Sequence, residues 1–283
     1  EWSHLTALAE AAHAPPRAAR RVAVVGTHGG AGASCLAVAL AREFAKLGPS
    51  RLAALNSAGA PAGALLGVTD GAGWVEAVAA VEAGRPPPSR SVAGVELLSP
   101  AGPADGVAAW QVRQVIERWE TSGGHTVLDA GRSGPCGGWR AATWADGIVL
   151  VARADVAGLA AARRLADEMA PLGLTWRFAV REIPGGFKAA EAADRLGRGD
   201  VLRIGHERSL AAGLAHGLAP GDRSVGPLAA AARAVTAAER GTATPEAAAC
   251  GQRHRAARGP LRFRRRSWGP APAFNPAAFA EEW

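Results

Sequence analysis

The sequence predicts an α/β protein built on a doubly wound, mostly parallel sheet of about seven strands flanked by helices. Two observations predict this fold. From Val22 onward, short apolar segments alternate with segments of helical periodicity, and short turns join them. A glycine-rich turn also connects the first apolar segment to the first helical one. At 283 residues the chain is long enough to bury a substantial core.

The predicted strands are short apolar runs bounded by turn residues. Their alternation with helices favours parallel pairing, because a helix can return the chain to the start of the next strand. In chain order, the strand candidates are Val22–Val25, Leu52–Leu55, Val95–Leu98, Thr126–Asp129, Ile148–Val151, Trp176–Val180 and Val201–Ile204.

Apolar residues at helical spacing mark two of the intervening helices. Gly48 is a natural C-terminal stop for the first of them. Two late helices, at about 210–218 and 227–238, are expected to close the domain. The spaced apolar residues are Leu36, Leu40, Phe44 and Leu47 in the first helix, and Val112, Val115, Ile116 and Trp119 in the second.

Composition divides the chain into three parts. Residues 1–20 are predicted to be a remnant helix and a Pro-Pro linker from a missing N-terminal domain. Residues 21–240 form the α/β domain, and residues 241–283, rich in Arg, Pro and Ala, are predicted to be disordered. Seven Arg lie between Arg253 and Arg266, so most of the net charge of +7 belongs to this tail. The charge therefore does not by itself predict a folded surface that binds nucleic acid.

Cysteine usage and hydropathy indicate a cytoplasmic protein, either free or peripheral at the inner face of the membrane. Cys35, Cys136 and Cys250 have neither disulfide-framework nor metal-ligand spacing, which favours a reducing compartment. No apolar run approaches the roughly 18 residues of a membrane-spanning helix. Ser, His and Asp do not occur at the spacing of a nucleophile elbow, and no catalytic residue is assigned.

The glycine-rich turn has the layout of a phosphate-binding loop. Its sequence from His28 to Ser34 is HGGAGAS, and the lysine that normally precedes the Ser or Thr is replaced by Ala33. Backbone N–H groups at the start of a helix can still bind an anion. The predicted binding residues are Gly29, Gly30, Ala31, Gly32, Ala33, Ser34 and Cys35, and the candidate Mg²⁺ ligands are Ser34 and Asp129. Asp129 ends a strand, at the edge of the sheet where ligands bind.

The loop resembles K-G-G-x-G-K-[ST], the deviant Walker A loop of the ParA/MinD family. All three glycines are in register, and the two lysine positions hold His28 and Ala33. The segment HTVLDAGRS resembles the second switch strand of that family, with Asp129 at the acid position. Two later segments resemble the corresponding segments of one branch of the family, which contains septum-site-determining and CpaE/TadZ-like proteins. They are GIVLVARADVAGLAAARRLADEM and RSLAAGLAHGLAPGDRSVGPLAAAARAV. The resemblance covers residues 20–240. A G-G-A-G-A-S-T loop without the second lysine is common in this branch, and the present loop matches it except for Cys35 in place of Thr.

The resemblance implies a P-loop NTPase-like fold and a degenerate nucleotide site. It implies a role in septum-site determination and cell-division regulation, or in positioning a secretion-pilus apparatus. Partners would be proteins of the division or secretion machinery, together with a second copy in a homodimer. ATP or ADP with Mg²⁺ would be the cofactor if one is bound. Residues 1–14 would be the last helix of a receiver-like domain.

The residues themselves argue against efficient hydrolysis of a bound nucleotide. Phosphoryl transfer depends on positive charge placed against the transferred group, and loss of one preorganised donor costs roughly 3–4 kcal/mol. Both lysine positions are changed, and Asn56 stands where the first switch should carry an acid. We therefore expect that the chain binds nucleotide weakly and is not an efficient ATPase.

The sequence also predicts the surroundings of single loop residues. We expect His28 to be an exposed loop residue and Cys35 to be a small packing residue. Ala33 is expected to face solvent, so that a lysine there would raise phosphate affinity without disturbing the fold.

Two other functions remain open from the sequence. In the first alternative, the chain would be an active ATPase with an unorthodox loop, completed by an Arg from a partner. Alternatively, it is a nucleic-acid or anionic-membrane binding module that uses the Arg-rich tail, with contact through residues 251–268.

Overall fold

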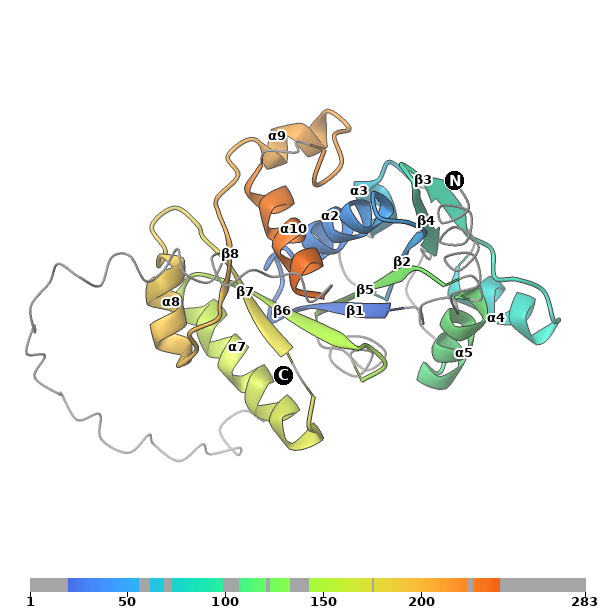
Figure 1. The fold of residues 1–283 in the computed structure, drawn as a ribbon, viewed down its shortest axis with the longest axis horizontal. Helices are drawn as coiled ribbons and strands as arrows, with labels where there is room; N and C mark the ends of the chain where they lie inside the picture. Colours follow the sequence, from blue (N-terminus) through green and yellow to red (C-terminus); the bar gives the residue numbers. More distant parts are fainter. Residues whose placement is uncertain are drawn as a thin grey trace, which may run out of the picture.

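The computed structural model describes residues 20–55, 62–68, 73–98, 107–120, 123–132, 143–174, 176–222 and 226–239. Within these residues, eight strands form one sheet in the order β3-β4-β2-β5-β1-β6-β7-β8 (Figure 1). All neighbours pair in parallel except β3 and β4. The strands are β1 (Arg20–Gly26), β2 (Ser50–Ala54), β3 (Arg90–Val92), β4 (Val95–Leu98), β5 (His125–Arg132), β6 (Gly147–Arg153), β7 (Trp176–Arg181) and β8 (Leu202–Ile204).

The predicted doubly wound sheet is confirmed, and each of the seven expected strands is present. The additional strand is β3, which forms an antiparallel hairpin with β4. Its three residues, RSV, are exposed or half-buried, so they carry no apolar run for the sequence to reveal. The turn at Ala93 and Gly94 has positive φ at both residues, 51° and 78°.

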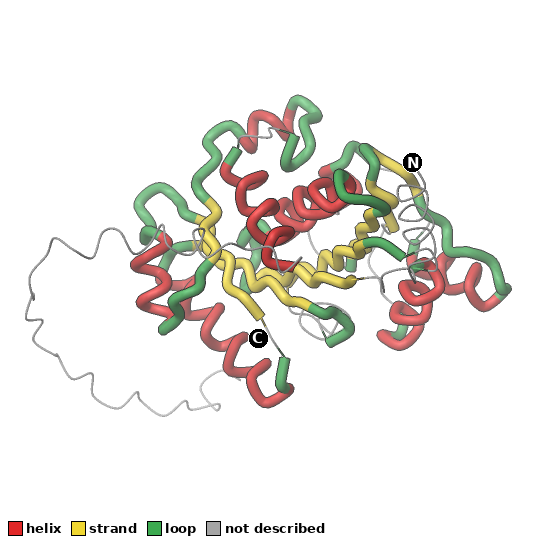
Figure 2. The backbone as a smooth tube through the Cα atoms, in the orientation of Figure 1, coloured by secondary structure: helices red, strands yellow, loops and turns green. Residues whose placement is uncertain are grey.

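Helices cover the sheet on both faces (Figures 1 and 2). On one face, α2 and α10 pack against the side chains of Val22 and Val24 of β1. On the other face, α4, α5 and α7 pack against Ala23 and Val25. The helices are α2 (Ala33–Ala45), α3 (Ala62–Leu65), α4 (Trp74–Glu82), α5 (Ala109–Trp119), α7 (Val156–Met169), α8 (Ala189–Leu196), α9 (Leu210–Ala215) and α10 (Pro227–Glu239), with a 3₁₀ turn at Ala170–Leu172.

The winding direction of the sheet reverses at β1. The chain runs from β1 outward to β2 and β4, returns to β5 beside β1, and continues on the other side through β6, β7 and β8. Ligands of such sheets bind where the winding direction reverses, beyond the carboxyl ends of the strands. The last residues of β1, β5, β6 and β7 therefore meet at one edge of the sheet.

Several sequence expectations concern residues outside the described ranges. These include the remnant helix of residues 1–14, Asn56, and the tail from residue 241. The domain boundaries at 1–20, 21–240 and 241–283 remain predictions. In the part of the chain that the structure describes, no helix combines the length and the apolar character needed to cross a membrane.

Candidate phosphate-binding site

The turn between β1 and α2 adopts a backbone that glycine makes possible. Gly30 and Gly32 have φ of 73° and 100°, in the left-handed region that side chains disfavour. Gly32 caps the helix, and the amide of Leu36 donates to its carbonyl at 3.0 Å. The amide of Ala31 donates to the carbonyl of His28 at 3.3 Å, which closes the turn.

The start of α2 leaves backbone donors available to a ligand. Because the Leu36 bond is the first of the helical series, the amides of Ala33, Ser34 and Cys35 have no carbonyl of their own helix to bond. The partial positive charge of the helix end adds to these donors. The predicted binding residues Gly29 to Cys35 thus run from the turn into the first residues of α2, with Gly29 and Gly30 exposed. This arrangement can bind an anion such as a phosphate.

Asp129 lies beside this turn and is fully buried. It pairs with Val24 across β5 and β1, and a bulge follows immediately, so that Val25 pairs with Gly131. Its Oδ1 accepts a hydrogen bond from the amide of Gly131 at 3.3 Å. Burial raises the pKa of Asp129 from 3.8 to about 6, while hydrogen bonds from the Ser34 hydroxyl and the Gly131 amide oppose the rise.

The surroundings of the second carboxylate oxygen of Asp129 indicate whether Ser34 and Asp129 suit a metal ion. Oδ2 is buried and has no hydrogen-bond partner among the described residues. An orphaned carboxylate oxygen next to a serine hydroxyl fits Mg²⁺, which prefers hard oxygen ligands and takes one or two of them from protein. The described residues contain no group of three or more His, Cys, Asp or Glu that would hold a metal without a ligand. The two predicted ligands, Ser34 and Asp129, are thus brought together.

Ala33 does not face solvent, and this expectation was wrong. Its side chain is 7% exposed. It packs against the end of β1, where a Cβ added to Gly26 would lie 3.3 Å from the Ala33 Cβ and 3.3 Å from the Gly131 carbonyl oxygen. The loop and the turn after Asp129 approach each other so closely that little space remains for a longer side chain at position 33.

His28 is half-buried and engaged, which corrects the expectation of an exposed residue. Its Nδ1 lies 2.8 Å from the carbonyl oxygen of Gly29, and its Nε2 lies 3.5 Å from the amide of Arg153. The ring with the proton on Nδ1 satisfies both contacts, donating to the carbonyl and accepting from the amide. Its Nε2 also lies close to Gly158 of α7. The ring is thus held toward the start of α7.

Two arginines that the sequence analysis did not select lie next to the loop. Arg181 ends β7, and its Nε and Nη2 donate to the carbonyls of Ala31 at 3.0 Å and Gly30 at 2.6 Å. Arg153 ends β6 and pairs with Arg181 across the two strands. Arg153 forms an ion pair with Asp155, which also caps α7 by accepting from the amide of Gly158 at 2.7 Å. The signal in the sequence is their position just after the predicted strands Ile148–Val151 and Trp176–Val180, at the edge of the sheet where ligands bind.

Burial and charge act together on Arg181. Burial, followed by the positive charge of Arg153, lowers the pKa of Arg181. A guanidinium nevertheless remains charged at any physiological pH. Cys35, on the first turn of α2, packs against the core as expected, and burial raises the pKa of its thiol.

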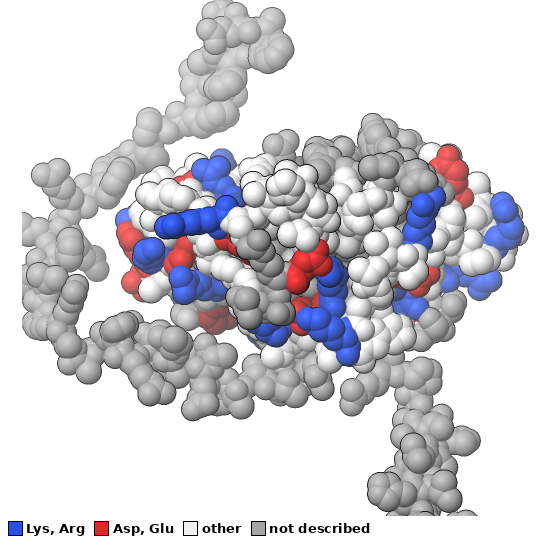
Figure 3. Space-filling model, turned by 90° about the horizontal axis from the view of Figure 1, so that it is seen from above, with Lys and Arg blue, Asp and Glu red and all other residues white. Residues whose placement is uncertain are grey.

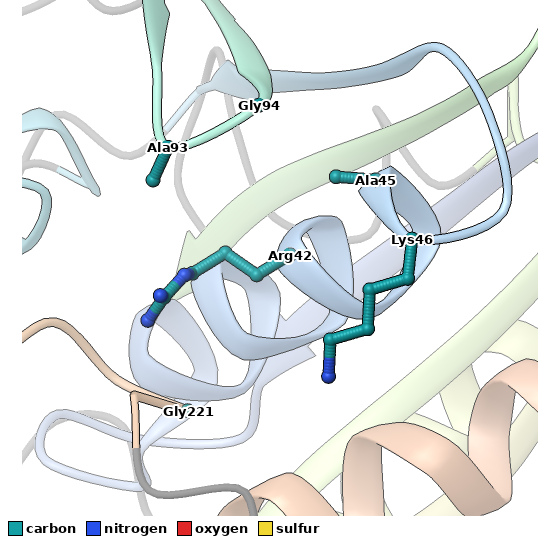
Figure 4. A pocket seen from close by; sticks show the side chains of 6 residues that line it. All are labelled: Arg42, Ala45, Lys46, Ala93, Gly94 and Gly221. Atoms are coloured by element: carbon teal, nitrogen blue, oxygen red, sulfur yellow. The ribbon is translucent and has the colours of Figure 1, made fainter.

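A separate hollow of about 200 Å³ lies at the opposite end of α2 (Figure 4). Its two cations are already paired, Arg42 with Asp222 and Lys46 with Glu43 at 2.5 Å. The hollow is therefore not part of the loop site. It is lined by Arg42, Ala45, Lys46, Ala93, Gly94 and Gly221.

Solved structures share the whole architecture. MinD from Pyrococcus horikoshii OT3, complexed with Mg-ADP, matches with a TM-score of 0.64 at 17% identity, covering 80% of this chain and 99% of that one. The MinC:MinD cell division protein complex from Aquifex aeolicus matches with a TM-score of 0.63 at 17% identity, covering 77% and 96%. A ParA family ATPase from Chlorobium tepidum TLS matches with a TM-score of 0.63 at 16% identity, covering 77% and 98%.

The chain has the fold of the MinD and ParA ATPases. No protein-family model and no curated protein matches the sequence. The likeness to the solved structures extends over nearly their full length, and the glycine-rich turn of this chain follows the carboxyl end of β1. Identities of 16% and 17% establish the fold and leave the activity to be argued from the residues.

Proposed function

We propose that the chain is a degenerate ParA/MinD-type protein of the septum-site-determining or CpaE/TadZ-like branch. It acts in septum-site determination and cell-division regulation, or in positioning a secretion-pilus apparatus. Nucleotide binding is weak and hydrolysis is negligible. One observation supports the proposal: on a MinD/ParA fold, the glycine-rich turn leads into a helix start with free amides, but the buried Ala33 and the hydrogen-bonded His28 stand where the family loop has lysines.

The residues present support binding more than turnover. The free amides at the start of α2 suit a phosphate, and Ser34 Oγ and Asp129 Oδ2 would hold Mg²⁺. Bound Mg²⁺ would neutralise phosphate charge. Neither Ala33 nor the engaged ring of His28 offers the transferred group a cation, and hydrolysis needs such charge in its transition state. The site is therefore proposed to serve conformation or dimerisation.

The proposed partners are proteins of the division or secretion machinery and a second copy of the chain. A complex between MinC and MinD supports this kind of partner for the fold. The proposed location is the cytoplasm, either free or at the inner face of the membrane. The nucleic-acid or membrane alternative depends on residues 251–268, which lie outside the described ranges.

Calorimetric titration with Mg-ATP and Mg-ADP, together with a phosphate-release assay on the full chain, tests the biochemical part. We expect weak binding and no phosphate release above a protein-free blank. Steady release that is abolished in Asp129→Ala would overturn the proposal in favour of an active ATPase. In cells, overproduction or depletion is expected to displace division septa or secretion-pilus assemblies. Normal placement of both would contradict the positioning role.

A further inference from the structure

We propose that Arg181 is the cation of this phosphate loop, taking over at the end of β7 the charge that the two missing lysines would have supplied. It would bind a phosphate group of a magnesium-nucleotide. This inference rests on the proposed function, since it names the residue through which the weak binding occurs. It is carried by four features of the site.

The first feature is that Arg181 is built into the loop. Its guanidinium makes two hydrogen bonds to consecutive loop carbonyls, those of Gly30 and Ala31. Its stem lies where a side chain at position 32 would project, because a Cβ on Gly32 would lie 3.3 Å from the Arg181 Cδ. The loop glycine thus makes room for the arginine, and the planar guanidinium is fixed in orientation by its two bonds.

The second feature is that the charge of Arg181 is not neutralised. No carboxylate in the described part of the chain forms an ion pair with it, whereas the neighbouring Arg153 is paired with Asp155. The Nη1 of Arg181 has no hydrogen-bond partner among the described residues, so its two N–H groups can bind a ligand oxygen. A guanidinium is well suited to phosphate because its donors match the spacing of two oxygens.

The third feature is the partial burial of the site. Burial and the nearby Arg153 both lower the pKa of Arg181, so this part of the protein disfavours the cation when it stands alone. An anion next to Arg181 would relieve that cost. Partial burial also reduces screening by water, so a phosphate interacts with Arg181 more strongly than with an exposed arginine.

The fourth feature is an independent sign of a missing ligand. Asp129 is fully buried with its Oδ2 unpartnered among the described residues, beside the same turn and hydrogen-bonded by Ser34. A free phosphate alone would add an anion near this carboxylate. A phosphate that carries a divalent cation satisfies both sides, with the metal near Ser34 and Asp129 and the phosphate near Arg181 and the helix start. The chemistry therefore favours a magnesium-bound nucleoside di- or triphosphate.

The test compares Arg181→Gln with Arg177→Gln in the full chain. The amide introduced by Arg181→Gln can still donate to a loop carbonyl, so the substitution removes the charge while keeping a donor. Arg177 lies on the same strand, four residues and roughly 13 Å toward its amino end, and is exposed, so its substitution makes the same change of net charge away from the loop. Arg181→Lys is the second variant, because it keeps the charge and loses the fork.

The probes are Mg-ADP, Mg-ATP, magnesium pyrophosphate and adenosine, titrated by calorimetry at low and moderate salt. For the three phosphate probes, we expect Arg181→Gln to weaken affinity about tenfold or more and to flatten the salt dependence. Arg177→Gln should remain within about twofold of the unmodified chain, and Arg181→Lys should fall between. Unchanged melting temperatures would show that the loss is not one of folding; if Arg181→Gln melts early, Arg181→Lys carries the comparison.

Three outcomes would contradict the inference, and they have different meanings. If the unmodified chain binds the phosphate probes and Arg181→Gln binds them equally well, the role of Arg181 is overturned and the proposed nucleotide site stands. If the unmodified chain binds none of them at millimolar concentration, both the proposed nucleotide site and the role of Arg181 are overturned. Equal losses in Arg181→Gln and Arg177→Gln would reduce the effect to net charge and would also overturn the assignment.

Discussion

The carboxyl group of Asp129 is expected to make a contribution to stability whose pH dependence is opposite in sign to that of a paired surface carboxylate. Burial raises its pKa from 3.8 to about 6, so between these values the folded protein keeps a proton that the unfolded chain releases. At this one group the folded state then binds more protons than the unfolded state, so the contribution of Asp129 to stability falls as pH rises, whereas the lowered pKa values of Asp155 and Glu182 act in the opposite direction. Above pH 6 the full penalty applies, roughly 3 kcal/mol for two pKa units.

Asp129→Asn is therefore expected to stabilise the protein at pH 7.5, by roughly 1–3 kcal/mol, and to have little effect near pH 3.5. The measurement is urea unfolding at several pH values in metal-free buffer. The control is Asp167→Asn, an exposed residue of α7. A gain that is equal at both pH values would show that the ionised carboxylate is not the cause.

A lysine at position 33 would affect both the stability of the protein and its affinity for nucleotide. Because its side chain is 7% exposed and packed against Gly26, Ala33→Lys must place a long stem where little space exists. We expect a loss of stability of about 1–3 kcal/mol, together with tighter binding of Mg-ADP if the ammonium reaches the start of α2. Ala33→Met, which has a similar length and no charge, should lose stability without gaining affinity. Unchanged stability in both variants would contradict the inference that there is little space around the side chain of Ala33.

At the scale of elements, the turn between β1 and α2 depends on glycine for two separate reasons. Gly30 has φ of 73° and nothing within 4 Å of an added Cβ, so substitution there introduces only backbone strain. Gly32 has φ of 100° and would also contact the stem of Arg181 at 3.3 Å. Substitution at Gly30 therefore tests backbone strain alone, whereas substitution at Gly32 tests backbone strain together with the contact with Arg181.

Gly30→Ala is expected to cost about 1–2 kcal/mol of stability through its backbone conformation. Gly32→Ala should cost as much and should also weaken Mg-ADP binding, because it displaces Arg181. Thermal unfolding and calorimetry on the two variants measure these effects. Equal affinity in Gly30→Ala and Gly32→Ala would argue that the stem of Arg181 is not held by the loop.

At the scale of the whole molecule, charge and fold are carried by different parts of the chain. On the face seen in Figure 3, the Lys and Arg side chains of the described residues are interspersed with Asp and Glu. Seven Arg and the acids Glu281 and Glu282 leave +5 of the net charge of +7 beyond Cys250. The buried clusters, by contrast, are built from residues between Val22 and Val235.

Removal of residues 251–283 is therefore expected to leave the melting temperature and Mg-ADP binding unchanged. Binding to anionic vesicles or to DNA, if the full chain shows any, should decrease steeply with salt and disappear on truncation. Differential scanning calorimetry and vesicle co-sedimentation measure the two properties. A fall of several degrees in melting temperature would show that the tail contributes to the fold.

The sequence by itself determined the sheet, the turn and the acid beside it. Seven strands could be predicted because each is a local apolar run that helices cover on both faces. The glycine-rich turn before a helix could be predicted because its glycines and the helix are adjacent in the chain, and the position of Asp129 could be predicted because it lies near the end of an apolar run. The hairpin strand β3 gave no such signal, since its three residues are short and not buried.

Only the tertiary structure decided which side chains complete the site. Arg181 meets the carbonyls of Gly30 and Ala31 across about 150 residues of sequence, and the contact exists because parallel pairing of β6 with β7 and of β1 with β6 brings these strand ends together. Burial of Ala33 and the engaged ring of His28 follow from the same packing. Periodicity and spacing report local geometry, whereas strand order and register arise from contacts between distant segments, so the contact of Arg181 with the loop was visible only in the folded chain.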